Sequence, residues 1–180
     1  FVFGAILFFM TFGMFGLMNT SSQIGTIIFQ TASITLGFML YLLLSVIVVD
    51  VFSLLIKTHA FYYGLTAIIL SLGISSYGIW NAFNVRLTEK EIAITGLQEN
   101  IRAMHLTDIH IGHFRGKEFL QSIVERTNAA NVDVVFMTGD LFDGKVALER
   151  ENMEPLMHLD APIYFIEGNH DNYTGIHQIK

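Results

Sequence analysis

The chain has no cysteine and almost no charge in its first half. Without cysteine there can be no disulfide framework and no thiolate metal site. Between residues 1 and 85 the only formal charges are Asp50 and Lys57. The net charge of -6 therefore belongs to the second half, which is acidic. Nonspecific nucleic-acid binding needs Lys and Arg to neutralise phosphates, so we expect no nucleic-acid partner.

Long apolar stretches fill this uncharged half. A helix needs about 20 mostly apolar residues to cross a bilayer, and residues 2–18, 34–56 and 61–83 each come close to that length. The first stretch could instead be a signal-peptide core, but it has no basic leader and no small-residue cleavage site. We therefore predict a transmembrane region over residues 1–85 with about three helices, in a multi-pass protein of the cell membrane.

Asp50 and the basic residues bear on how these helices cross. Asp50 is either an intramembrane functional group or a residue at the membrane surface, and the apolar residues before it favour the surface. One basic residue, Lys57, lies between the second and third stretches, whereas Arg86, Lys90 and Arg102 follow the third. The positive-inside rule then predicts that the second half is cytoplasmic.

The second half has the pattern of an α/β domain. Strands are predicted over residues 91–95, 101–107, 132–137 and 162–166, a helix over 118–128, and helical or irregular structure over 145–156. The continuous apolar run at 132–137 is typical of a strand buried on both faces. The order β-β-α-β-α-β predicts a largely parallel sheet with helices packed on it.

Polar residues follow three of these strands. Asp108 and His110 follow the second strand, Asp140 the third and Asn169 the fourth, with 32 positions from Asp108 to Asp140 and 29 from Asp140 to Asn169. A β-α-β unit returns to the same edge of a sheet in roughly 30 residues. We therefore expect these four side chains at one rim, where open α/β sheets bind ligands.

The four side chains form a set of metal ligands. Two carboxylates, an imidazole and an amide oxygen suit Mn²⁺, Fe or Zn²⁺ better than a soft metal. The two oxygens of Asp140 allow it to bridge two ions. Paired ions can clamp the attacking and leaving oxygens of a displacement at phosphorus and lower the pKa of bound water.

Three motifs carry a family resemblance. Asp108-x-His110, Gly139-Asp140 and Gly168-Asn169-His170-Asp171 together resemble the calcineurin-like metallophosphoesterase superfamily. Within it, the chain is similar to the membrane-associated bacterial branch of YkuE-type and YaeI-type enzymes. The resemblance covers about residues 91–173 and implies a four-layer α/β/β/α sandwich. Because the family's later histidine motifs are missing, residues 86–180 are expected to be the N-terminal part of that domain.

The resemblance also implies roles for residues. Asp108 and His110 would bind a first divalent metal ion, Asp140 would bridge, and Asn169 would bind a second, with Mn the leading candidate and Fe or Zn as alternatives. His170 would contact the phosphate and assist the leaving group. Asp171 would fix the ring of His170.

Three further residues lie near these motifs. Asp143 is either support for a metal ligand or a solvated turn residue, and the sequence does not choose between the two. His113 and Arg115 could touch the substrate phosphate, but an exposed loop is the favoured interpretation.

These observations predict a membrane-anchored, metal-dependent hydrolase of phosphomonoesters or phosphodiesters. Membrane attachment suggests a lipid-linked phosphoester or a wall precursor as substrate, and no protein partner can be identified. The alternative is a noncatalytic scaffold or binding module on a phosphoesterase-like fold. The intact set of Asp108, His110, Asp140 and Asn169 favours the enzyme.

Overall fold

Two long apolar helices dominate the first half of the computed structural model, which describes residues 2–175 without the side chains of residues 2, 3 and 7. α2 (Gln23–Ser53) and α3 (Ala60–Phe83) are long and apolar enough to cross a membrane. The chain forms two compact units, one joining Phe1–Gln30 to Ile94–Lys180 and the other comprising Thr31–Ala93.

The first apolar stretch was predicted to be a third span and is shorter than expected. It forms α1 (Val2–Thr11) and a π-helical turn, η1 (Phe12–Gly16). Two glycines, Gly13 and Gly16, lie in that turn, and glycine disfavours a regular helix interior. Among the described residues, only α2 and α3 therefore have the length of a span.

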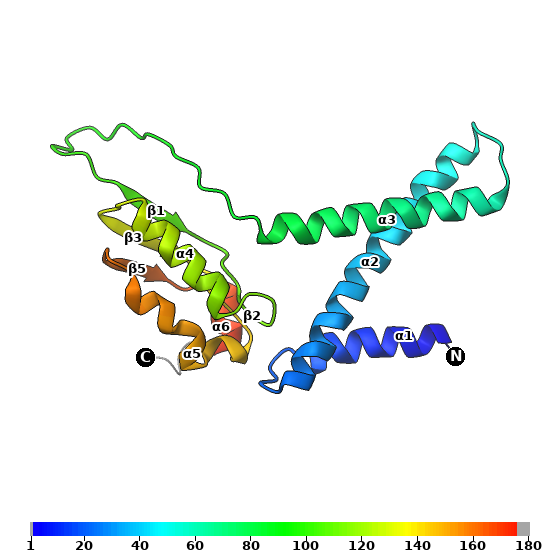
Figure 1. Cartoon of the computed structure of the whole chain (residues 1–180), viewed down its shortest axis with the longest axis horizontal. Helices are drawn as coiled ribbons and strands as arrows, with labels where there is room; N and C mark the ends of the chain where they lie inside the picture. Colours follow the sequence, from blue (N-terminus) through cyan, green and yellow to red (C-terminus); the bar gives the residue numbers. More distant parts are fainter. Residues whose placement is uncertain (1, 176–180) are drawn as a thin grey trace. The chain divides into compact units, whose positions relative to one another are not determined.

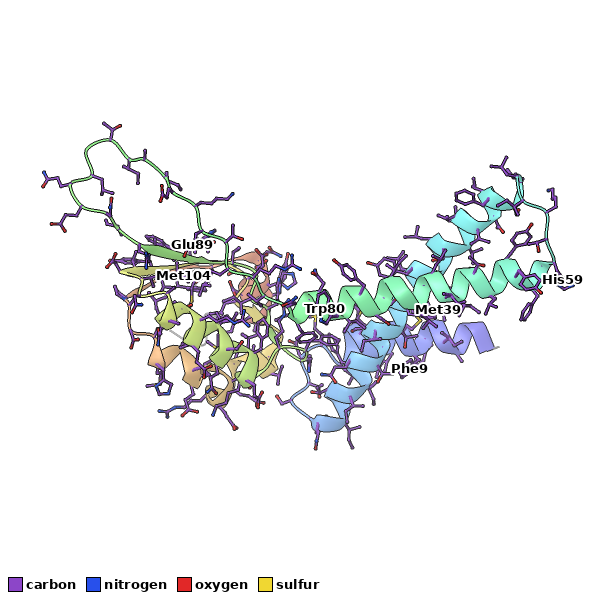
Figure 2. All side chains as sticks on the ribbon, turned by 45° about the horizontal axis from the view of Figure 1, so that its top comes forward. Phe9, Met39, His59, Trp80, Glu89 and Met104 are labelled. Atoms are coloured by element: carbon purple, nitrogen blue, oxygen red, sulfur yellow. The ribbon has the colours of Figure 1, made fainter. Side chains whose placement is uncertain are left out.

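Within the second unit, α2 and α3 present apolar side chains to their surroundings. Leu43 and Ile69 are more than half exposed, and Figure 2 shows side chains radiating from both helices, with Met39 on α2 and Trp80 on α3. The helices touch through small residues: Ser71 is fully buried, and its hydroxyl donates to the carbonyl of Phe38 at 3.3 Å. Small residues at the contact and apolar residues outside are typical of packing in lipid.

A parallel sheet organises the second half. β1 (Ala103–Leu106), β3 (Val134–Thr138) and β5 (Ile163–Ile166) pair in the order β1-β3-β5, all parallel. α4 (Lys117–Ala129) lies across one face of the sheet (Figure 1). The parallel α/β architecture predicted from the sequence is confirmed.

A small second sheet was not predicted. β2 (Ile111–Gly112) pairs in parallel with β4 (Phe142–Asp143) just beyond the ends of β1 and β3. The strand predicted at residues 91–95 is wrong, because this segment is exposed and pairs with no strand among the described residues. That prediction rested on the local sequence, whereas a strand requires a partner.

The core lies between α4 and the sheet. Leu120 of α4 and Val135 of β3 are fully buried, and Ile111 and Phe142 extend the cluster into the small sheet. Burying a side chain such as Leu120 contributes about 2 kcal/mol. The prediction that β3 is buried on both faces is wrong for the described residues, since Phe136 is 41% exposed on the side away from α4.

Short elements complete the domain. The segment predicted to be helical or irregular forms η2 (Lys145–Leu148), α5 (Arg150–Met153) and η3 (Glu154–His158). α6 (Asn169–Thr174) follows β5 directly. The segments that follow β1, β3 and β5 thus lie at the same edge of the sheet. They carry the residues of the predicted site.

Candidate metal centre

Backbone hydrogen bonds join the loops that follow β1 and β3. The N–H of Asp108 donates to the carbonyl of Gly139 at 3.2 Å, and the N–H of His110 donates to that of Asp140 at 3.0 Å. Side-chain ligand atoms of Asp108, His110 and Asp140 all lie within 4.8 Å of one another. The structure therefore brings together three of the four side chains that the strand spacing placed at one rim.

These three residues share an unusual backbone conformation. Asp108, His110 and Asp140 have φ angles of 55°, 52° and 54°, in the left-handed region that non-glycine residues seldom adopt. Such strain persists where the surrounding structure fixes it, and it concentrates at functional sites. Here the two inter-loop hydrogen bonds fix it, and they aim all three side chains at a common point.

The third loop brings Asn169 and His170 to the same edge. Asn169 is the exposed first residue of α6. The N–H of His170 donates to Oδ1 of Asp140 at 2.9 Å. The ring of His170 packs edge-on against that of His110, with centroids 4.7 Å apart. The four predicted ligand residues and His170 thus come from the loops after β1 and β3 and from the start of α6.

Asp143 supports His170. Its Oδ1 lies 3.4 Å from Nδ1 of His170. With His110, these two residues form a second cluster whose ligand atoms lie within 4.8 Å of one another. The structure therefore places Asp143 as a partner of a site residue, which the sequence alone left undecided.

Asp171 has a different place from the one expected. Its side chain was predicted to fix the ring of His170, but it is fully buried and accepts three backbone hydrogen bonds of 2.8 Å, from Asp140, Phe142 and Gly168. Asp171 thus holds the loops after β3 and β5 together. The adjacent position in sequence was misleading, because residue 171 lies inside the first turn of α6 and faces the loop backbone.

His113 and Arg115 also differ from expectation. The exposed loop predicted here is wrong for His113, which is only 9% exposed and has both ring nitrogens hydrogen-bonded within the protein. Arg115 donates from Nη1 to the carbonyls of Asp108 at 3.3 Å and Ile109 at 2.8 Å. Partial burial lowers the pKa of Arg115. Both residues support the loop that carries Asp108 and His110.

Sequence reasoning missed two smaller contributors. The hydroxyl of Thr107 donates to Oδ2 of Asp108 at 2.7 Å. The buried hydroxyl of Thr174 accepts the N–H of Gly144 at 3.1 Å, which ties α6 to the end of β4. Thr107 had one available signal, its position at the end of a predicted strand and directly before a predicted ligand.

The motifs and their geometry agree with comparisons to known proteins. The sequence profile for calcineurin-like phosphoesterases matches residues 101–179. These residues thus carry a calcineurin-like metallophosphoesterase domain. The metallophosphoesterase domain thus contains all the loops described above, and the enzyme family predicted from the motifs is confirmed.

Several relatives carry the same domain name. The chain is 34% identical over 125 residues to a transmembrane protein with metallophosphoesterase domain from Danio rerio. These aligned residues cover 66% of this chain and 29% of the relative. It is 41% identical over 78 residues to a putative metallophosphoesterase from Caenorhabditis elegans, covering 42% of this chain and 16% of the relative. An uncharacterized metallophosphoesterase from Helicobacter pylori is 32% identical over 96 residues, covering 52% and 26%.

The chain therefore spans less than a third of the length of these curated relatives. No solved structure matches it. The zebrafish relative is named a transmembrane protein, and together with the two apolar helices of this chain that name indicates membrane association. Metallophosphoesterases use divalent metals, and the clustered side chains provide candidate ligands for them.

Proposed function

We propose that this protein is a membrane-anchored, metal-dependent hydrolase of phosphomonoesters or phosphodiesters. The observation that carries the proposal is the convergence of Asp108, His110 and Asp140 within 4.8 Å, next to the pair formed by His170 and Asp143. A group able to bind metal and a group able to move a proton thus share one edge of the sheet.

The residues present fit a divalent ion. The donors are oxygen and imidazole nitrogen, which suit Mn²⁺, with Fe and Zn²⁺ as alternatives. Asp108 and His110 would hold a first ion, Asp140 would bridge, and Asn169 would offer an amide oxygen to a second. When bound, the ions supply a water of lowered pKa as nucleophile and positive charge for the phosphate.

The proton chemistry falls to His170. Asp143 lies against Nδ1 and orients the ring, so the proton that reaches the leaving oxygen is the one on Nε2. A positioned acid of this kind contributes typically 10²–10⁴-fold in rate. The backbone hydrogen bond from His170 to Asp140 fixes where this acid sits relative to the metal ligands.

The membrane helices suggest the class of substrate. α2 is 31 residues long, about 46 Å at the rise of an α-helix, and so exceeds the roughly 30 Å hydrocarbon core of a bilayer. A catalytic domain anchored in this way works beside the headgroups, where a lipid-linked phosphoester would be its substrate. The basic residues Arg86, Lys90 and Arg102 after α3 favour a cytoplasmic location for the domain.

A substrate panel on the full-length protein tests the proposal. The purified protein should hydrolyse nitrophenyl phosphomonoesters or phosphodiesters with Mn²⁺, lose activity with chelator and recover when Mn²⁺ returns. A lipid phosphate presented in vesicles should be cleaved more efficiently than its soluble headgroup. Activity that survives exhaustive chelation with no metal bound would exclude the metal mechanism.

Matched variants locate the site. Asp140→Asn removes a carboxylate predicted to touch both ions, and its turnover should fall by more than the roughly 10–100-fold typical of an outer-shell partner. Asp160→Asn changes the same chemical group at an exposed position away from the site and should behave as wild type. A wild-type protein that binds Mn²⁺ but cleaves no phosphoester would instead support the noncatalytic scaffold.

A further inference from the structure

His113 is buried three residues after a predicted metal ligand, yet its contacts reach far back in the sequence. Its Nε2 lies 2.9 Å from the carbonyl oxygen of Met18, and its Nδ1 lies 3.0 Å from the hydroxyl of Thr26. Its ring packs against that of Phe29, with centroids 4.5 Å apart. Because a carbonyl only accepts, Nε2 carries the proton and Nδ1 accepts from Thr26 when the ring is neutral.

The contact extends to both loops of the small sheet. The side-chain amide of Gln30 donates to the carbonyl of His113. The carbonyl of Met18 also lies against Gly144, where an added Cβ would stand 2.7 Å from that oxygen. All of these residues lie in the same compact unit. The segment Met18 to Gln30 thus contacts the loops after β2 and after β4. This segment includes the first two turns of α2.

These loops lead directly to the site. β2 pairs with β4, whose last residue is Asp143, the partner of His170. The N–H of Gly112 donates to the carbonyl of Arg115 at 2.9 Å, and Arg115 in turn donates to the carbonyls of Asp108 and Ile109. A displacement of His113 would therefore move the backbone that holds Asp108 and His110.

We propose that His113 is a positioning residue, which clamps the loop of the first metal ligands to the start of the membrane helix. This inference rests on the proposed function, because it assigns His113 a role in the same site. The left-handed conformations of Asp108 and His110 need outside support, and the contacts of His113 supply part of it. The first two turns of α2 are thereby a structural component of the metal site.

The contact between His113 and Thr26 can be tested by an experiment that does not depend on enzyme activity. The chain has no native cysteine, so Thr26→Cys and His113→Cys can be introduced as a pair in the full-length protein. A short thiol-specific cross-linker should join residues 26 and 113, identified by mass spectrometry of the peptides. The pair Thr26→Cys and His158→Cys, whose second position is exposed and lies in the same compact unit, is the control and should not be joined. No link between residues 26 and 113 in folded protein would overturn the proposal.

The positioning role is tested by metal affinity. His113→Ala should weaken Mn²⁺ binding about 10–100-fold, measured by titration of the metal-free protein. Since His113 touches no substrate, kcat at limiting Mn²⁺ should fall while KM stays unchanged, and excess Mn²⁺ should restore kcat. His113→Gln keeps one donor and one acceptor and should recover much of the affinity. Exposed His158→Ala should match wild type.

A second variant guards against failure to fold. Thr26→Val keeps the shape of the side chain, removes one hydrogen bond from His113 and should weaken Mn²⁺ binding by a smaller factor in the same direction. A cross-link together with unchanged Mn²⁺ affinity in both variants would reject the positioning role. Mn²⁺ binding without hydrolysis by wild type would reject the proposed function alone, while the titrations would still decide the role of His113.

Discussion

The backbone N–H of His170 lies 2.9 Å from Oδ1 of Asp140 and donates a hydrogen bond to it. This bond joins the proposed bridging ligand to the proposed acid. Gly168 permits the close approach, because a Cβ at that position would stand 2.2 Å from Oδ1 and 2.5 Å from the backbone nitrogen of Asp140. The separation of the two groups is therefore set by backbone packing.

Gly168→Ala should disrupt the site sterically. The φ angle of Gly168 is −99°, which alanine adopts readily, so the cost comes from the collision with Asp140. We expect loss of metal affinity and of turnover. Gly116→Ala is the matched control, since its Cβ would meet only Glu118 at 3.7 Å. Metal titration of both variants checks the prediction, and wild-type affinity in Gly168→Ala would contradict it.

His170→Ala should separate proton transfer from metal binding. Turnover should fall by roughly 10²–10⁴-fold with metal content unchanged, because the ring is proposed to donate a proton and not to bind metal. The loss should be smaller for nitrophenyl esters, whose leaving groups need little protonation. Loss of metal from this variant would make His170 a ligand, and an equal loss on all leaving groups would remove its role as an acid.

Asp143→Asn should reproduce that pattern more weakly. An amide cannot orient the ring of His170 as a carboxylate does, and losing such a partner typically costs 10–100-fold. The dependence on leaving group should match that of His170→Ala, and the double variant should be little worse than His170→Ala alone. Additive losses, measured on one poor and one good leaving group, would show that the two residues act independently.

Asp171→Ala should act mainly on stability. Its fully buried carboxylate satisfies three backbone N–H groups, and each donor left unpaired in the interior costs about 1–3 kcal/mol. We expect a loss of at least about 3 kcal/mol, seen as a lower midpoint in thermal unfolding of the detergent-solubilised protein. Asp160→Ala, at an exposed position, is the control and should leave the midpoint unchanged.

Residues 57 and 86 should lie on opposite sides of the membrane. They flank α3, which has the length and hydropathy of a span. Lys57→Cys and Arg86→Cys can be labelled separately in sealed vesicles with an impermeant thiol reagent, because the chain has no native cysteine. One position should react before permeabilisation and the other only after it. Labelling of both from the same side would show that α3 does not cross.

The sequence predicted that Asp108 and Asp140 would lie close together, because the number of residues between them matches one β-α-β unit and the carboxyl ends of parallel strands lie at one edge of a sheet. Asp108 and Asp140 follow paired strands, so their meeting required only a β-α-β unit of ordinary length. The small sheet escaped prediction because strands of two residues are too short to show a period. The strand predicted at residues 91–95 was wrong for a different reason, since this segment pairs with no strand among the described residues.

Side-chain partners were harder to predict than loops. Asp171 adjoins His170 in the chain and was assigned to its ring, whereas Asp143 is the residue beside that ring. His170 and Asp171 are neighbours in the short helix α6, where successive side chains face different directions. His113 was beyond local reasoning altogether, because its partners Met18 and Thr26 lie 95 and 87 residues away.

The left-handed backbone at Asp108, His110 and Asp140 lowers the stability of the domain while it places the proposed metal ligands. Each such residue costs of order 1 kcal/mol or more, and glycine would adopt the same conformation without that cost. Mutation towards a more stable domain would therefore tend to remove ligands first. Selection for stability alone would leave a well-folded domain that had lost its metal, and retention of all three side chains requires selection on what they bind.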